Sequence, residues 1–300
     1  MNIVSTLNIN RLIGWLTVLA SSFFFYLATV IIRWSQPYTT ISSAYYAFAR
    51  FSLGFLIVLS VMILKKQRPR PKNFHYLLGR AVGNTLAVYY FYRAIDFGTV
   101  AEANILNMTY PLFVAVISWF ALKDERDFFA VIAVVVAFVG VYLILAPIDA
   151  TQGLRNLPGL VSGITAGVAM VYLTLCRRDH DSETILLFMF GFGWLGMVLL
   201  FHDSFFWPDR VQCFFLTICS LVGVAGQYCL TYGYRYVTSV EGSVISSSRI
   251  LMAALLGPIM VADAPLSWWG WGGALLIFAS NWALAVRKPA GSGPRILGRS

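Results

Sequence analysis

Two arginines lie deep inside long apolar runs of the sequence, where a charge is costly to place. Arg249 stands near the middle of the run 240–262, and Arg50 stands well inside the run 43–64. A guanidinium is always charged and offers a planar fork of donors that fits a carboxylate or another anion. Both side chains are therefore predicted to line a polar cavity and to bind an anionic group. The alternative is a structural pairing with a carboxylate or with helix-end carbonyl groups.

A third arginine, Arg80, stands only a short way into the run 76–97. Its long aliphatic stem allows the charged head to reach the membrane interface while the stem stays among apolar groups. Arg80 is therefore predicted to snorkel to the interface, and it is left out of the candidate site.

Polar residues recur at spacings of three and four along these runs, which places each set on one face of a helix. Large polar side chains on such a face favour a wet cavity, whereas small residues favour close helix packing. The predicted substrate-binding residues are Arg249, Arg50, Tyr26, Asn107, Tyr110, Gln227, Ser246 and Tyr172. By contrast, Gly159, Gly163 and Gly167 are predicted to form a packing face.

Motifs for catalysis are absent from the sequence. It contains no GxxxxGK[ST] loop for nucleotide phosphates, no HExxH zinc motif and no GxSxG nucleophile motif. No enzymatic activity, cofactor or metal site is therefore predicted. Glu102 and Glu241 stand at the first turn of their predicted helices, where the helix dipole favours an anion. They are predicted to be structural caps, so the interior field is positive and disfavours purely cationic substrates.

The composition identifies the solvent around these residues as lipid. Of the 300 residues, 59% are hydrophobic and 12% are charged. Soluble domains average about 45–50% apolar and about 25% charged residues. The net charge of +9 comes from basic residues between the apolar runs, which indicates topology signals and not a nucleic-acid surface.

Ten apolar runs are long enough to cross a bilayer. A helix is predicted for each, because lipid offers no partner for backbone N–H and C=O groups. The predicted spans are 12–32, 43–64, 76–97, 100–122, 128–145, 157–175, 184–201, 211–234, 240–262 and 267–286.

The basic residues predict the orientation. With the N-terminus in the cytoplasm, the cluster Lys65, Lys66, Arg68, Arg70 and Lys72 lies inside, as does most of the remaining Lys and Arg. An even number of spans then returns the C-terminus to the cytoplasm.

The chain also repeats itself. Residues 89–145 align with a segment 139 positions later without a gap, so that Tyr89 meets Tyr228 and Asp124 meets Asp263. The predicted halves are residues 1–147 and 153–290, followed by a disordered tail at 291–300. Because each half holds an odd number of spans, the second half must be inverted relative to the first.

Several short motifs in these halves resemble the EamA-type family of the drug/metabolite transporter superfamily. They are Ala49-Arg50-Phe51, Pro111, Leu122-Lys123-Asp124, and Asp263 before Ala264-Pro265-Leu266. The resemblance implies an all-α membrane protein with ten helices in two inverted five-helix repeats around a central cavity. Two positions depart from the family pattern: Ile250 replaces a proline, and Arg249 stands where many relatives have Glu.

The predicted function is secondary, ATP-independent transport of a small-molecule substrate by alternating access. Export of amino acids or related carboxylates is favoured; nucleobases, nucleosides or S-adenosylmethionine-like metabolites are the alternative. A membrane-embedded enzyme or a nonselective channel is less favoured, since the chain has no acid/base pair and carries internal pseudo-symmetry. The predicted location is the lipid bilayer of a bacterial plasma (inner) membrane, without a nucleic-acid partner, as a monomer or a homodimer.

Overall fold

The computed structural model describes residues 3–121, 128–145, 157–237 and 239–287, and its regular structure is helical throughout. The predicted tail at 291–300 lies outside the described residues. The helices are α1 (Ile3–Ser35), α2 (Ser43–Leu64), α3 (Phe74–Phe97), α4 (Val100–Asn107), α5 (Tyr110–Ala121), α6 (Phe128–Leu145), α8 (Leu157–Cys176), α9 (Ser182–Phe201), the 3-10 helix η2 (His202–Ser204), α10 (Arg210–Gly233), α11 (Ser239–Val261) and α12 (Trp268–Arg287).

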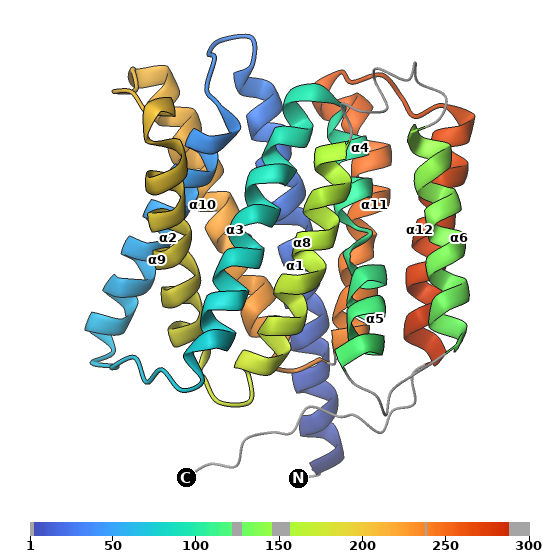
Figure 1. Cartoon of the computed structure of the whole chain (residues 1–300), viewed down its shortest axis with the longest axis horizontal. Helices are drawn as coiled ribbons and strands as arrows, with labels where there is room; N and C mark the ends of the chain where they lie inside the picture. Colours follow the sequence, from blue (N-terminus) through green and yellow to red (C-terminus); the bar gives the residue numbers. More distant parts are fainter. Residues whose placement is uncertain (1–2, 122–127, 146–156, 238, 288–300) are drawn as a thin grey trace.

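The helices stand side by side and alternate in direction, so the chain crosses the bundle ten times within the described residues (Figure 1). The start of α1 and the end of α12 lie at the same end of the bundle, called the lower end here. Five helices, α1, α2, α8, α9 and α10, are each long and apolar enough to cross a membrane on their own. The all-α, ten-span prediction is confirmed.

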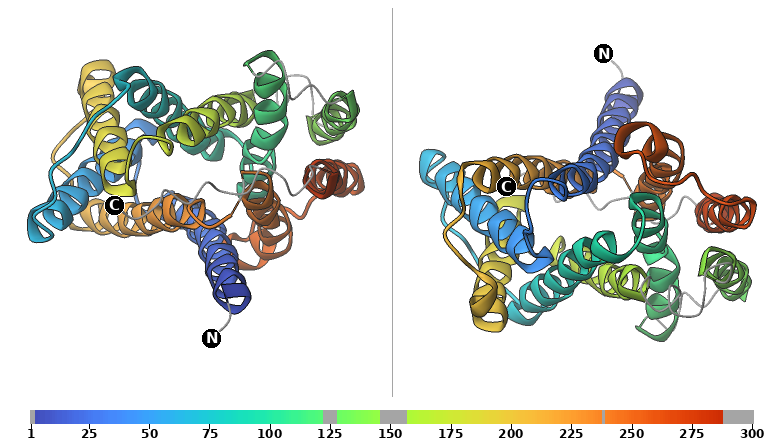
Figure 2. Two further views of the ribbon diagram at one scale, coloured as in Figure 1. Left: turned by 90° about the horizontal axis from the view of Figure 1, so that it is seen from below. Right: turned by 90° about the horizontal axis from the view of Figure 1, so that it is seen from above.

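The helix contacts come in pairs that relate the two halves. Helix α1 packs on α10 as α8 packs on α3, and α2 packs on α10 as α9 packs on α3. Three further contacts, α2 with α9, α4 with α11 and α6 with α12, join an element to its own counterpart. Figure 2 shows α2 and α9 at one end of the elongated cross-section and α6 and α12 at the other. A two-fold relation across the helix axes explains this pattern, as expected for inverted five-helix repeats.

The fourth predicted span is broken, which corrects the prediction of one continuous helix over 100–122. Helix α4 ends at Asn107 and α5 begins at Tyr110. Pro111 explains the break, because it has no N–H to donate to the carbonyl of Asn107 and its ring crowds that group. The carbonyls beside the break find side-chain donors: Asn281 Nδ2 donates to Met108 O over 3.1 Å, and Thr109 Oγ1 donates to Leu106 O over 2.7 Å. The counterpart α11 stays continuous through Ile250, where no proline intervenes.

The glycine face of α8 packs directly against this break, as predicted from its spacing. A Cβ added to Gly163 would lie 2.3 Å from Thr109 Oγ1 and 2.8 Å from Leu106 O. Gly159 meets the Leu106 side chain, and Gly167 meets Phe113 in the same way. The absence of side chains on this face therefore lets α8 hold the two half-helices in place.

Substituting Gly163 tests this contact. Gly163→Ala should destabilise the protein by about 1–3 kcal/mol, because the added methyl overlaps backbone atoms that cannot move aside. A matched control is Gly196→Ala on α9, where the nearest atom would be 3.8 Å away. The control should be neutral or slightly stabilising, since alanine is the better helix former. Melting temperatures in detergent provide the measurement, and equal values for the two variants would contradict the packing role.

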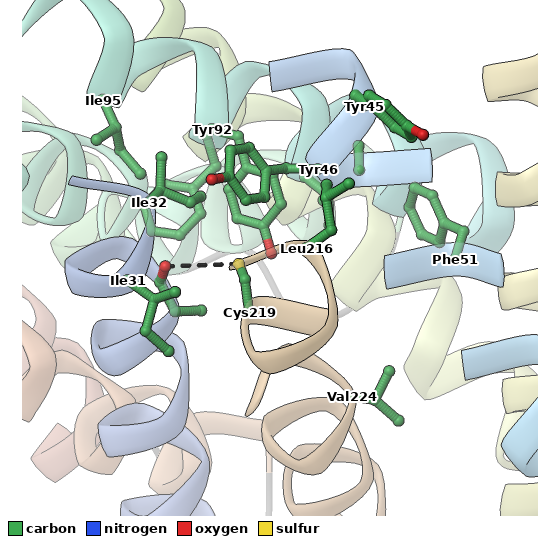
Figure 3. Packing of buried hydrophobic residues seen from close by; sticks show 14 of the residues in the cluster. Ile31, Ile32, Tyr45, Tyr46, Phe51, Tyr92, Ile95, Leu216, Cys219 and Val224 are labelled. Atoms are coloured by element: carbon green, nitrogen blue, oxygen red, sulfur yellow. Dashed lines mark hydrogen bonds between the residues drawn. The ribbon is translucent and has the colours of Figure 1, made fainter. Parts of the chain in front are cut away.

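An aromatic and aliphatic core lies between α1, α2, α3 and α10 (Figure 3). Tyr46 and Tyr92 are buried there in an edge-to-face arrangement, with ring centroids 6.4 Å apart. The Tyr46 hydroxyl donates a hydrogen bond of 2.6 Å to Ser35 Oγ, and the Cys219 thiol donates to Ala28 O over 3.6 Å. Aromatic pairs of this geometry add about 0.5–1.5 kcal/mol beyond their buried area. The core therefore holds Tyr92 firmly in the wall that faces the interior of the bundle.

Candidate functional site

A cavity of about 80 Å³ lies at the centre of the bundle, between helices of both halves. Its polar lining residues are Ser22, Arg50, Arg80, Asn84, Asn107, Tyr110, Gln227, Ser246 and Arg249. Pockets that hold drug-sized ligands usually measure about 300–1,000 Å³. This cavity is smaller than such pockets, so a metabolite of that size fits only if the helices around it move apart.

Three arginines contribute to this lining, and all of them are removed from solvent. The exposed fraction is 3% for Arg50, 2% for Arg80 and 3% for Arg249. None of them forms an ion pair with a carboxylate within the described part of the chain. Burying an uncompensated charge costs several kcal/mol, so such a cluster is retained only where another requirement outweighs stability.

Arg249 reaches the cavity from α11, and its neighbours are neutral. Its Nη2 donates to Asn107 Oδ1, the side chain at the end of α4. Its guanidinium carbon lies 5.1 Å from the ring centroid of Phe91 and 5.7 Å from that of Phe25. Aromatic faces attract a cation without neutralising it. Arg249 is thus positioned at the broken span while its charge stays uncompensated.

Arg50 reaches the same cavity from α2. Its Nη1 donates to the Tyr92 hydroxyl over 3.0 Å, and its Nη2 donates to Gln227 Oε1 over 3.4 Å. Its guanidinium carbon lies 5.1 Å from the Phe25 centroid. Arg249 also lies against that ring, so the Phe25 side chain contacts both guanidinium groups.

Arg80 also lines the cavity, so the prediction that it snorkels to the interface is wrong. Its Nη1 makes a weak contact of 3.9 Å with the sulfur of Met170. The glycines on either side of it explain its direction. Gly79 lies against the Tyr172 ring and Gly83 lies against Ala169, both on α8. This tight packing of α3 on α8 keeps Arg80 among side chains and away from lipid.

Several buried donors around the cavity have no hydrogen-bond acceptor. They are the Nε atoms of Arg50, Arg80 and Arg249 and the Nδ2 atom of Asn84. Buried polar groups are almost always hydrogen-bonded, so four unpartnered donors around one cavity call for an acceptor that the protein itself does not supply. These four atoms are donors, and the unpartnered Ser246 hydroxyl can donate or accept, so the lining fits a ligand that is rich in acceptor oxygens.

The structure brings together six of the eight predicted site residues. Arg249, Arg50, Asn107, Tyr110, Gln227 and Ser246 all line the cavity. Tyr26 and Tyr172 do not: Tyr26 is fully buried in the core, and the Tyr172 ring packs on α3. Sequence reasoning missed Arg80, Asn84, Phe25 and Phe91. A helical step of four from Arg80 to Asn84 was the available signal, whereas the two phenylalanines are indistinguishable from core residues.

Glu102 stabilises the start of its helix. Glu102 forms a capping box with Thr99 at the start of α4, as its first-turn position predicts. Its Oε2 accepts from Thr99 N over 3.0 Å, and Thr99 Oγ1 accepts from Glu102 N over 3.1 Å. The Glu241 side chain lies outside the described residues. Among the described residues, no cluster of His, Cys, Asp and Glu is arranged to hold a metal ion.

Ionic contacts tie the helices together at both ends of the bundle. At the upper end, Asp263 accepts from Arg33 Nε over 2.9 Å and from the backbone N–H of Val100 over 2.8 Å. These three groups, called the Asp263 latch, join the end of α1, the start of α4 and the segment after α11. At the lower end, Lys65 pairs with Glu183 over 3.0 Å, and Glu183 also accepts from the Tyr232 hydroxyl. The helices that surround the cavity are therefore joined to one another at both ends of the bundle.

Comparison with known proteins gives a consistent picture. The sequence profile of the EamA-like transporter family matches residues 12–146 and 156–285. A Helicobacter pylori protein described as an uncharacterized transporter is 25% identical over 284 residues, covering 92% of this chain and 95% of that protein. Human solute carrier family 35 member G1 is 23% identical, covering 92% of this chain and 80% of the human protein.

A named exporter and a solved structure complete the comparison. The pseudopaline exporter CntI of Pseudomonas aeruginosa is 23% identical over 268 residues, covering 89% of this chain and 94% of that protein. The crystal structure of another protein superposes on this chain with a TM-score of 0.60 at 17% sequence identity. The superposition covers 93% of this chain and 97% of the other chain. At that identity the likeness concerns the fold alone.

Proposed function

Because this chain belongs to the EamA-like transporter family, we propose that it is a secondary exporter of small metabolites that carry a carboxylate or a related anionic group. The family assignment makes the protein a multi-pass transporter and not an enzyme. Amino acids and related carboxylates are the substrate class proposed first. The proposed binding residues are the six predicted residues that line the cavity.

The observation that carries this proposal is the set of buried arginines around the cavity. Their guanidinium groups contact amide, hydroxyl, sulfur and aromatic groups, all of which are neutral. An anionic substrate would supply the missing charge and accept from the free Nε donors. Purely cationic substrates meet a repulsive field.

Alternating access is the proposed mechanism. The cavity lies between two inverted repeats, near the break between α4 and α5, and discontinuous helices of this kind commonly form substrate sites in transporters. The cavity is too small for most metabolites in this form, so in this mechanism the helices must move apart at each end in turn. The outward direction is supported by the relative named as a pseudopaline exporter. The division into halves at 1–147 and 153–290 is retained as part of this proposal.

The lower end of the bundle is proposed to face the cytoplasm of a bacterial cell. The basic cluster at 65–72 joins α2 to α3 at that end, whereas Asp203 and Asp209 lie at the upper end. Basic connections remain on the cytoplasmic side of a membrane. A cysteine placed at Asp203 should react with an impermeant reagent in intact cells, whereas one at Arg68 should not. The exposed Cys213 must first be replaced by serine, and the reverse labelling pattern would invert the proposed topology.

Exchange in proteoliposomes tests the transport function. Liposomes with the purified protein should accumulate radiolabelled alanine, glutamate or succinate when preloaded with the same unlabelled compound. The polycation spermidine should not exchange, because the cavity repels it. Failure of all three carboxylates, and also of the phosphate monoester glycerol 3-phosphate, to exchange with folded protein in the membrane would refute the proposal.

A further inference from the structure

We infer that the substrate is a compound with at least two negative charges, such as a dicarboxylate or a phosphate monoester. Arg50 and Arg249 both bind this compound beside the Phe25 ring. This inference rests on the transport function proposed above and narrows its substrate class. It starts from the number of charges in the cavity, which exceeds what a single carboxylate neutralises.

The cavity holds three buried cationic groups and, among the described residues, no anionic one. Arg50, Arg80 and Arg249 line the same 80 Å³ space and are each at least 97% buried. Like charges repel strongly at low dielectric. A substrate with one negative charge would leave two guanidinium groups uncompensated, whereas a dianion would leave one.

Arg50 and Arg249 share a neighbour in the cavity, the Phe25 ring, and this common position favours one ligand that contacts both guanidinium groups. The guanidinium carbons of Arg50 and Arg249 lie 5.1 and 5.7 Å from the centroid of one ring, that of Phe25. Each head also retains a free Nε donor in addition to the Nη atoms that bind Tyr92, Gln227 and Asn107. Two acceptor groups on one small skeleton can therefore each meet a guanidinium edge.

The same lining disfavours zwitterionic amino acids within the proposed class. An α-ammonium group needs an anion or several acceptors, and the free polar atoms of the arginines and of Asn84 are all donors. Arg80 and Asn84 stand one helical turn apart on α3 and extend the donor surface. The cavity therefore suits a ligand whose polar atoms are mostly oxygen acceptors.

Matched substrate pairs test the charge requirement. Succinate and succinamate share a skeleton and differ by one charge, and glycerol 3-phosphate and glycerol differ by a phosphate. At equal ionic strength, succinate should exchange in proteoliposomes at least about tenfold faster than succinamate. Glycerol 3-phosphate exchange without succinate exchange would identify phosphate as the anionic group. Exchange of alanine or succinamate at rates equal to or above those of both dianions would overturn the inference while leaving the transport proposal intact.

Substitutions then assign the charge selectivity to the arginines. Arg50→Gln and Arg249→Gln should each lower the succinate-to-succinamate ratio at least about fivefold. Arg93→Gln is the matched control, because Arg93 is an exposed arginine on α3 outside the cavity lining, and it should keep the wild-type ratio.

A measurement on the wild-type protein covers the case in which a variant does not fold. Succinate should raise the melting temperature in detergent more than succinamate does at the same concentration and ionic strength. Equal shifts for the two compounds, or unchanged ratios in the folded arginine variants, would refute the bridging role.

Discussion

Replacing Arg249 by alanine should reduce anion transport at least about 100-fold while leaving the protein folded. A 100-fold loss corresponds to about 2.8 kcal/mol, which is within the range of a charge-assisted hydrogen bond to a bound anion. Removing an unpaired buried charge also removes its desolvation penalty, so the melting temperature should stay the same or rise. Transport in proteoliposomes and melting in detergent are the two measurements, made on the same preparation.

Two companion variants separate charge from geometry and from general effects. Arg249→Lys keeps the charge but loses the planar fork, so transport should fall to an intermediate level with folding preserved. Arg93→Ala removes an exposed arginine that contacts Tyr89 and should transport normally. If Arg249→Ala transports normally but melts at a much lower temperature, Arg249 is a structural strut for Asn107, and the binding role is wrong.

The span pattern was accessible from the sequence because lipid imposes it. Continuous apolar runs, basic connections and the 139-residue internal shift each reflect a constraint that acts on composition and not on detailed packing. The break between α4 and α5 needed the structure, since a proline inside a membrane helix is also compatible with an unbroken helix, as Pro258 in α11 shows. The match of Pro111 with Ile250 indicated an asymmetry between the halves, but not which backbone groups would separate.

The sequence predicts those residues of the candidate site that place a charged group inside an apolar run. Arg50 and Arg249 were recognised because a charge deep in an apolar run is expensive wherever it points. Arg80 was misplaced because depth was judged from the start of the run, and the packing of Gly79 and Gly83 on α8 could not be seen. Phe25 and Phe91 carry no polar signal, so their contacts with the guanidinium groups emerge only in three dimensions.

The sequence does not predict the Asp263 latch, because its contacts also form only in three dimensions. The internal repeat aligns Asp263 with Asp124, but it does not predict that Asp263 accepts hydrogen bonds from Arg33 and Val100. In the structure its side chain is only 3% exposed, and its partner Arg33 is 30% exposed. The positive φ of 52° at Ala262 turns the chain so that the carboxylate reaches α4. Such a conformation is uncommon for alanine and persists only where the surrounding contacts require it.

Opening of the upper end should follow when this carboxylate is removed. Asp263→Ala deprives both Arg33 and the Val100 N–H of their acceptor, two hydrogen bonds to a charged group that are each worth about 1.5–3 kcal/mol. These hydrogen bonds connect α1, α4 and the segment after α11. Helices α1, α4 and α11 contribute Phe25, Asn107 and Arg249 to the cavity lining. The equilibrium should therefore shift towards a form whose cavity is open at the upper end, by about tenfold or more.

A cysteine reporter inside the cavity measures this shift. Ser22→Cys is nearly isosteric and lines the cavity, and Cys213 and Cys229 are replaced by serine to remove background labelling. Added to that chain, Asp263→Ala should raise the rate of reaction with an impermeant reagent from the upper side at least about tenfold. Arg33→Gln should raise it less, because the bond from Val100 to Asp263 survives. Lys65→Gln breaks the ion pair at the opposite end and should not raise it at all. Equal labelling rates in the Asp263→Ala variant and its parent would show that the latch is a passive helix tie and that closure of the upper end depends on the apolar packing of α1 against α11.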